Sequence, residues 1–234
     1  MTGVGEILVV IPARGGSKRL PRKNVLPLAH KPMICWTIEE AIAAKLSGRI
    51  MVSSDDEEIL TIARRYQADG VIAHRRPDIY ATDEATTLDV LIDVLQVAKA
   101  SGFQPKTLII LQPTSPLRRS DDILEALDKF RNGGCLHTVV SVCEVDHPTA
   151  WIGSVTSDSF FIGASSTSKR SQEYDTEYRL NGAVYILNTT LVLQERRLFT
   201  EKTLASKMPR SRSLDIDDWY DFKICEALLS SRSN

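Results

Sequence analysis

The sequence predicts an α/β fold in which a mostly parallel sheet lies between two layers of helices. Two observations carry this prediction: short apolar segments rich in Ile, Leu and Val recur along the chain, and longer segments with helical periodicity separate them. Such alternation is typical of right-handed βαβ units. The length of 234 residues and a hydrophobic content of 43% suit one large domain, 1–234, with an inserted segment.

The first half of the chain supplies three strands, each followed by a helix. The strands are expected at 7–12, 49–54 and 71–74. Pro32 suits the start of a helix over about 32–46, and Asp55 or Asp56 suits the cap of a second helix that ends near Gly70. A third helix, through 88–95, is expected to stop at Gly102.

The second half continues the alternation and interrupts it once. Strands are expected at 107–112, 137–143 and 181–188, and the segment 213–217 is expected to end a further strand. Helices are expected from a Ser120 or Asp121 cap, through Leu191 and Leu193, and from Asp217 or Asp218 to Leu229. Residues 144–180 break the pattern with frequent Ser, Thr and charge, which is typical of a lid or binding loop. We therefore predict that 144–180 is an insertion.

The loop after the first strand has the composition of a polyphosphate site. Gly15 and Gly16 let the backbone approach a ligand closely, and Ser17 adds a hydroxyl group. Five cations lie beside them: Arg14, Lys18, Arg19, Arg22 and Lys23. Ligands of open α/β sheets bind past the carboxyl ends of the strands, where this loop begins. The alternative is a solvated basic turn, and the loop matches neither the GxxxxGKS/T nor the GxGxxG pattern.

Two further polar loops are expected at the same edge of the sheet. LQPTSPLRR presents Gln112, Thr114, Ser115 and Arg118 on a turn stiffened by two prolines. The alternative there is a rigid turn with a helix cap. RRPDIYATDEATT brings Arg76 to this edge, whereas a simpler interpretation gives Thr82 or Asp83 the cap of the next helix.

The segment SLDIDD predicts a metal site. Asp215 and Asp217 lie two residues apart, so their carboxylates can lean toward the same face. Mg²⁺ is usually held by one or two carboxylates together with substrate phosphates and water. Asp217 or Asp218 also suits the cap of the last helix, and both roles can coexist.

Composition disfavours several other classes of protein. No segment approaches a membrane span, and the polar start MTGVGE lacks the regions of a signal peptide, so a cytoplasmic location without membrane contact is expected. The cysteines show no CxxC spacing and the histidines no HxxxH or HExxH spacing, which gives a zinc site little support. A net charge of −1 argues against binding to nucleic acid.

The chain resembles the cytidylyltransferases that activate nonulosonic acids, in five segments that occur in order: IPARGGSKRLPRKN, RRPDIYATDEATT, LQPTSPLR, YRLNGAVYI and SLDID. This resemblance spans about residues 7–229. It implies a Rossmann-like nucleotidyltransferase fold and an enzyme that couples CTP to a nine-carbon α-keto acid sugar, giving a CMP-sugar and pyrophosphate. N-acetylneuraminic and legionaminic acids are both open as acceptors. Mg²⁺ is the implied cofactor, as one ion or two.

The resemblance also implies roles for individual residues. Arg14, Lys23 and Asp217 are the implied catalytic residues. CTP would be bound by Arg14, Gly15, Ser17, Lys18, Asn24, Arg76 and Thr87. The acceptor sugar would be bound by Gln112, Asn181, Tyr185 and Arg170, and the metal by Asp215 and Asp217.

Members of this family are typically homodimers in which the inserted segment closes the sugar site of the partner. Residues 144–180 would take that role here, with Lys169 or Arg170 near the sugar carboxylate. The sequence departs from the family pattern at RSQEYDTEY, where the arginine is displaced by one position and a proline is missing. The alternatives are a Kdo cytidylyltransferase, a pseudaminic acid cytidylyltransferase and a non-catalytic nucleotide-binding protein.

Overall fold

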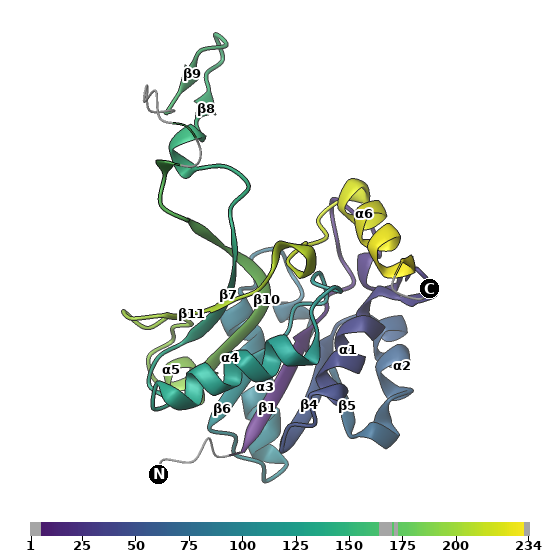
Figure 1. The fold of residues 1–234 in the computed structure, drawn as a ribbon. Coiled ribbons are helices and arrows are strands. Elements are labelled where there is room, and N and C mark those ends of the chain that lie inside the picture. Colours follow the sequence, from purple (N-terminus) through teal and green to yellow (C-terminus); the bar gives the residue numbers. More distant parts are fainter. Residues whose placement is uncertain (1–5, 164–169, 171–172, 232–234) are drawn as a thin grey trace.

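In the computed structural model, which describes residues 6–163, 170 and 173–231, seven strands form one central sheet (Figure 1). They are β1 (Ile7–Pro12), β4 (Gly48–Ser54), β5 (Val71–Arg75), β6 (Thr107–Ile110), β7 (Val139–Glu144), β10 (Tyr178–Asn188) and β11 (Leu204–Lys207). The strand order is β11-β7-β10-β6-β1-β4-β5, and β10 runs antiparallel to both of its neighbours. The other four pairings are parallel, which confirms the predicted α/β class and mostly parallel sheet.

Helices cover both faces of this sheet, as the alternation of side chains along β1 requires. Val9 and Ile11 of β1 pack in a core cluster with α1 (Met33–Ala43), α2 (Glu57–Arg64) and α4 (Ser120–Asn132). Leu8 and Val10 point to the other face and pack with α3 (Thr87–Ala100) and α5 (Thr189–Leu193). The predicted three-layer arrangement therefore follows from one strand whose side chains are buried on both faces.

A third, smaller core cluster lies under the last helix, α6 (Trp219–Ser230), beyond the end of β1 (Figure 1). Phe222 of α6 shares this cluster with Leu20 from the loop after β1, Leu28 of the short β2 (Pro27–Leu28) and Ile216. A second two-residue strand, β3 (Lys31–Pro32), pairs with β2. Because Ile216 is fully buried, the aspartates on either side of it are held beside the β1 loop.

The segment between β7 and β10 forms an arm that extends away from the sheet and carries a small hairpin, β8 (Ser154–Val155) and β9 (Phe161–Ile162) (Figure 1). The chain leaves the sheet after Glu144 and returns to it at Tyr178. The predicted insertion at 144–180 therefore overlaps β7 by its first residue and β10 by its last three. Within the described residues, no helix is both long enough and apolar enough to cross a membrane.

Several predicted helix bounds were wrong. The helix expected over 32–46 ends at Ala43. The one expected to end near Gly70 ends at Arg64, before a separate 3-10 turn at Gln67–Asp69. The helix expected from a Ser120 or Asp121 cap already includes Ser120. Its first turn begins there because the carboxylate of Asp122 accepts the Arg119 backbone N–H at 2.9 Å.

The segment 213–217 is not the end of a strand, as its sequence had indicated. It follows a 3-10 turn at Arg210–Arg212 and is held by single contacts, such as the Ile216 N–H donated to the Thr114 carbonyl at 2.8 Å. The strand before it, β11, was not predicted, because LASK has neither an apolar run nor clear alternation.

Candidate active site

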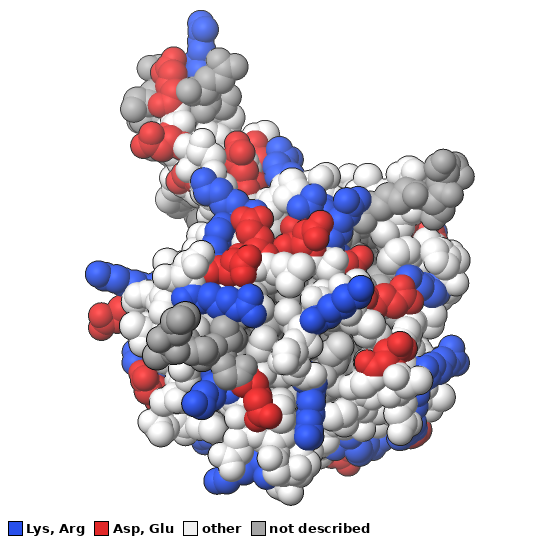
Figure 2. All heavy atoms as spheres, turned by 60° about the horizontal axis from the view of Figure 1, so that its bottom comes forward, with Lys and Arg blue, Asp and Glu red and all other residues white. Residues whose placement is uncertain are grey.

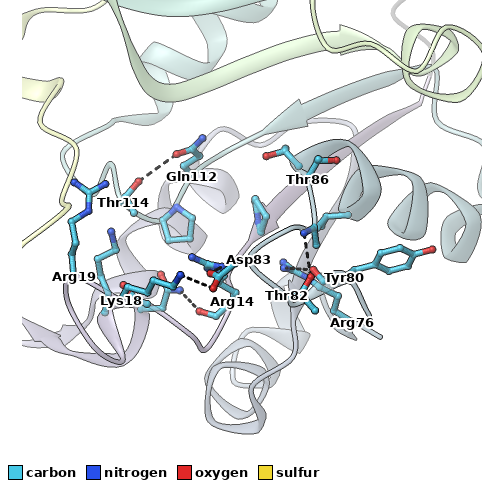
Figure 3. Close-up of a pocket in the computed structure, with 18 of the residues that line it drawn as sticks. Arg14, Lys18, Arg19, Arg76, Tyr80, Thr82, Asp83, Thr86, Gln112 and Thr114 are labelled. Atoms are coloured by element: carbon cyan, nitrogen blue, oxygen red, sulfur yellow. Dashed lines mark hydrogen bonds and ion pairs between the residues drawn. The ribbon is translucent and has the colours of Figure 1, made fainter. Parts of the chain in front are cut away.

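A cavity of about 630 Å³ opens past the carboxyl ends of β1 and β6 (Figure 3). Four segments line it: the loop after β1, residues 76–90, the loop after β6 and Asp217. Among the predicted site residues it brings together Arg14, Ser17, Lys18, Lys23, Asn24, Arg76, Thr87, Gln112 and Asp217. Residues widely separated in the sequence therefore line one open cavity, as the strand-end argument predicts.

The loop after β1 is fixed against the start of α2. The Gly15 N–H donates to Asp55 Oδ1 at 3.0 Å, and a Cβ at Gly15 would stand 2.7 Å from Asp56 Oδ2. The Asn24 amide donates to the Arg14 carbonyl at 3.0 Å. Gly15 thus shapes the loop from behind, whereas Arg14 and Asn24 line the cavity itself.

Positive charge is dense in the lining of the cavity. Five cationic side chains line it: Arg14, Lys18, Arg19, Lys23 and Arg76. The face at the bottom of Figure 1, which Figure 2 brings forward, instead carries intermixed basic and acidic side chains. A cluster of fixed cations in a concave site is a suitable environment for an anionic ligand.

Two carboxylates each hold two of these cations. Asp83 binds Arg14 at 2.9 Å and Lys18 at 2.7 Å. Asp217 lies 3.2 Å from Arg19 and 3.7 Å from Lys23. The sequence had indicated Asp83 as a possible helix cap, but Thr86 caps α3, accepting the Asp89 N–H. The signal that could have found this role for Asp83 is an acidic residue in a loop expected at the same strand edge as the basic loop.

Lys23 is the deepest of the cations that face Asp217. Its amino group donates to the Ile216 carbonyl, and its side chain is 10% exposed. Burial lowers the pKa of Lys23, and the nearby charges of Asp217 and Asp215 partly offset this. The charged end therefore lies where the basic loop meets the aspartate segment.

Asp215 is partly buried, and its buried Oδ1 atom has no hydrogen-bond partner among the described residues. Burial raises the pKa of Asp215, and the charge of Asp217 adds to this effect, while a hydrogen bond with Thr114 lowers it. An unpaired buried carboxylate oxygen is costly, so its retention points to a cationic ligand.

The two aspartates fit a magnesium ion that is shared with a substrate. No group of three or more His, Cys, Asp or Glu side chains in the described part of the chain could hold a metal without help. Two carboxylates beside a cavity lined by cations nevertheless suit Mg²⁺, which completes its coordination with phosphate oxygens and water. Asp215 offers the unpaired oxygen, and the half-exposed Asp217 faces the cavity.

Arg76 and Thr87 lie on the opposite side of the cavity. The Arg76 guanidinium is buried and donates to the Ser53 carbonyl at 2.8 Å and to the Tyr80 carbonyl at 3.4 Å. Burial lowers the pKa of Arg76. Thr87 is the first residue of α3, directly after the Thr86 cap. This side therefore presents hydroxyls and an arginine that is held by backbone carbonyls.

Gln112 is the predicted sugar residue that lines the cavity. The buried Arg118 holds its loop, donating to the carbonyl oxygens of Gln112 at 3.1 Å and Ala183 at 2.9 Å. Opposite Gln112 lies Gly182, at φ +74°, where a Cβ would stand 3.3 Å from Gln112 Oε1 and 3.6 Å from Asp215 Oδ2. The glycine bulge in β10 thus keeps open the space between Gln112 and Asp215.

The other predicted sugar residues lie outside the lining of this cavity. Asn181 is buried and donates to Ser213 Oγ at 2.9 Å, so it anchors the segment that leads to the aspartates. Tyr185 is partly buried against Phe199, and burial together with the charge of Asp215 raises its pKa. Arg170 is exposed beyond the cavity, and Lys169 lies outside the described residues.

Comparison with known proteins gives a consistent family. Residues 8–150 match the family model described as cytidylyltransferase. An N-acylneuraminate cytidylyltransferase of Escherichia coli O18:K1:H7 is 34% identical over 94% of this chain and 51% of its own length. A CMP-N,N'-diacetyllegionaminic acid synthase of Legionella pneumophila is 32% identical over 96% of both chains. The chain thus spans about half the length of the first of these relatives.

A solved structure extends the likeness to the fold. CMP:2-keto-3-deoxy-manno-octonic acid synthetase complexed with CTP superimposes with a TM-score of 0.72 at 19% identity, covering 97% of this chain and 99% of the other. At that identity the likeness concerns the fold alone. It agrees with the Rossmann-like nucleotidyltransferase fold that the sequence indicates.

Proposed function

This chain belongs to the cytidylyltransferase family, and we propose that it transfers a cytidylyl group from CTP to a nonulosonic acid, releasing pyrophosphate. The observation that carries the proposal is the meeting of the basic loop with the aspartate segment at one cavity, through Lys23 and Asp217. A triphosphate needs such cations, and a metal-assisted displacement needs the carboxylates.

In this proposal the cavity binds CTP in two parts. Arg14, Ser17 and Lys18 hold the triphosphate, and Asn24, Arg76 and Thr87 face the nucleoside. Arg76 is fixed by the Ser53 and Tyr80 carbonyls, so it can recognise a base or ribose with little loss of entropy. The Arg14 guanidinium and the Lys18 ammonium make charge-assisted hydrogen bonds to phosphate oxygens.

The reaction is one in-line displacement at the α-phosphate. The anomeric hydroxyl oxygen of the sugar forms the new bond to the α-phosphorus, and the bond from that phosphorus to the oxygen bridging to the β-phosphate breaks. Pyrophosphate departs with the bridging oxygen, and the hydroxyl proton passes to solvent water. Lys23 stabilises the negative charge that develops on the phosphoryl oxygens. Mg²⁺ held by Asp215 and Asp217 would neutralise charge on the same oxygens and on the leaving pyrophosphate. No protein nucleophile is needed.

The acceptor in this proposal is an acidic sugar of the nonulosonate class, bound beside Gln112 and Gly182. The names of the two relatives support this class and leave sialic and legionaminic acids as equal candidates. Kdo and pseudaminic acids are the alternatives within the same chemistry. Acceptors that differ by small substituents are separated by few contacts, so an assay has to choose among them.

The arm supports a homodimer in which the partner completes the sugar site. Its hairpin exposes several apolar side chains close together, including Val155 at 69% and Phe161 at 57%. Contiguous exposed apolar surface commonly marks an interface between proteins. Arg170 lies on the same arm. Its positive charge would pair with the carboxylate of a sugar bound in the neighbouring subunit.

The test is a pyrophosphate-release assay with CTP, Mg²⁺ and a panel of N-acetylneuraminic, legionaminic, pseudaminic and Kdo acids. We expect turnover with one of the first two acids. Turnover with pseudaminic or Kdo acid alone would show that this acid, and not sialic or legionaminic acid, is the acceptor. CTP binding without turnover of any acid would favour a nucleotide-binding protein that lacks catalysis, and replacing CTP by UTP or ATP would test the choice of base.

A further inference from the structure

Asp83 bridges the two cations on one side of the cavity. Its Oδ1 atom accepts from Arg14 at 2.9 Å, and its Oδ2 atom lies 2.7 Å from the Lys18 ammonium. Figure 3 shows the carboxylate reaching from the 77–86 loop to both side chains of the β1 loop. Each oxygen therefore has its own cation, which is also how two oxygens of a phosphate would be bound.

This arrangement leaves the cations engaged where the proposed function requires them to bind triphosphate. Arg14 and Lys18 both line the cavity, and so does Asp83. An incoming phosphate would be repelled by the carboxylate and would also have to replace it on both cations. The carboxylate and the phosphate thus compete for one subsite.

We propose that Asp83 is an internal competitor of the triphosphate: it occupies the Arg14 and Lys18 subsite until nucleotide displaces it, and so weakens triphosphate binding and couples it to withdrawal of the Asp83 side chain from these cations. The inference rests on the proposed function in naming CTP as the displacing ligand. The competition itself concerns any polyphosphate that enters this subsite.

The two ion pairs contribute little to folding, which favours a role in binding. The Asp83 side chain is 53% exposed, and exposed ion pairs add little to stability. The loop is held at its ends by other contacts: Arg76 donates to the Tyr80 carbonyl, and Thr86 caps α3 in a capping box with Asp89. Asp83 is thus free to leave while both ends of the loop stay anchored.

A second acid on the same loop provides a matched control. Asp78 starts the 3-10 turn Asp78–Tyr80, its side chain is 89% exposed, and it lies 3.8 Å from Arg75. Asp78 is not among the described residues that line the cavity. Replacing Asp78 removes the same charge from the same loop without emptying the Arg14 and Lys18 subsite.

The affinities of two ligands separate competition from direct recognition. If Asp83 competes with phosphate, the apparent dissociation constant is the intrinsic one divided by the fraction of protein with a free subsite. Asp83→Asn would then strengthen binding of CTP and of inorganic tripolyphosphate by the same factor. If Asp83 instead contacts the ribose or base, the substitution would weaken CTP binding and spare tripolyphosphate.

The experiment is calorimetric titration of the wild type, Asp83→Asn and Asp78→Asn with CTP and with tripolyphosphate. We expect Asp83→Asn to bind both ligands roughly three- to tenfold more tightly, and Asp78→Asn to match the wild type. The gain should shrink at high salt, since exposed ion pairs are screened. Thermal unfolding should show all three proteins equally folded.

Equal or weaker tripolyphosphate binding by Asp83→Asn would overturn the inference, and so would a wild type that binds neither ligand. A wild type that binds tripolyphosphate but shows no binding of CTP would instead overturn the proposed function. In that case the tripolyphosphate titrations would still decide the role of Asp83, so the two failures can be told apart.

Discussion

The Nζ atom of Lys23 lies 3.7 Å from Oδ1 of Asp217, and it also donates to the Ile216 carbonyl, 193 positions further along the chain. This contact joins the loop after the first strand to the segment before the last helix. It depends on the burial of Ile216 under α6, which turns both neighbouring aspartates toward the basic loop. The basic loop and the aspartate segment therefore meet at one cavity.

The adjacent residues Asp217 and Asp218 should separate catalysis from stability. Asp217 faces the cavity, whereas Asp218 caps α6 by accepting the Tyr220 and Asp221 N–H groups. We expect Asp217→Asn to lose about 100-fold or more in kcat while its unfolding stays close to that of the wild type. Asp218→Ala should keep its turnover but lose about 1 kcal/mol of stability. Pyrophosphate release measures the effect on turnover, and thermal unfolding measures the effect on stability. Loss of turnover in Asp218→Ala and loss of stability in Asp217→Asn would show that Asp217 is not the metal ligand.

Asp215→Asn should make the protein more stable and less active. The substitution removes a partly buried charge whose buried Oδ1 atom has no partner among the described residues, and we expect a gain of about 1 kcal/mol, or roughly 2–4 °C in Tm. Turnover should fall, because a metal ligand is lost. An unchanged or lower Tm at neutral pH would show that the carboxylate has a compensating partner.

The gain in stability expected for Asp215→Asn should depend on pH in a defined direction. Burial raises the pKa of Asp215 above its ordinary value of 3.8, so just above pH 3.8 the folded protein binds more protons at this site than the unfolded chain. The stability of the wild type therefore falls, at this site, as pH rises from 3.8 through the folded-state pKa. Denaturant unfolding of both proteins from pH 4 to 7 should show a difference in unfolding free energy that grows with pH.

The sequence predicted the position of the cavity better than the side chains that line it. Parallel strands place their following loops at one edge, so Arg14, Arg76 and Gln112 could be assigned to the same region. The sequence places Asp83 at the same edge as the basic loop, but it does not say which cations Asp83 pairs with, because that depends on how one loop folds over another. Which of several hydroxyls and acids caps α3 depends likewise on local geometry.

The β10 residues show a second limit of sequence interpretation. Counting in twos along NGAVYI assumes a regular strand, but Gly182 has φ +74°, and the pairing with β7 shifts between Leu180 and Tyr185. A bulge re-aims the side chains around it, so the face occupied by Asn181 does not follow from alternation. Asn181 therefore lies in the interior, bonded to Ser213, although YRLNGAVYI resembles a sugar-binding segment.

Gly182→Ala should impair acceptor binding in addition to stability. The new Cβ would stand 3.3 Å from Gln112 Oε1, in a backbone conformation with φ +74° that alanine adopts at a cost of about 1 kcal/mol or more. Gly70→Ala is the matched control, because Gly70 has φ +83° but open space around it. The Tm should fall by a similar amount in both variants. Gly182→Ala alone should raise the KM for the sugar, by about tenfold, and leave the KM for CTP nearly unchanged. Equal kinetics in the two variants would remove Gln112 from the acceptor site.

The arm should control assembly without supporting the fold of the subunit. Val155 and Phe161 pair across the hairpin and are mostly exposed, so Val155→Asp together with Phe161→Asp places charge on a surface outside the core clusters. We expect the double variant to keep its Tm as a subunit but to shift from dimer to monomer in light scattering, since charges in an apolar interface are strongly disfavoured. Ile79→Asp is the control, because Ile79 is 69% exposed on a 3-10 turn of the main body.

If the partner's arm completes the sugar site, the monomer should also show a raised KM for the sugar while its affinity for CTP is retained. A wild type that is already monomeric at assay concentration would contradict the shared site.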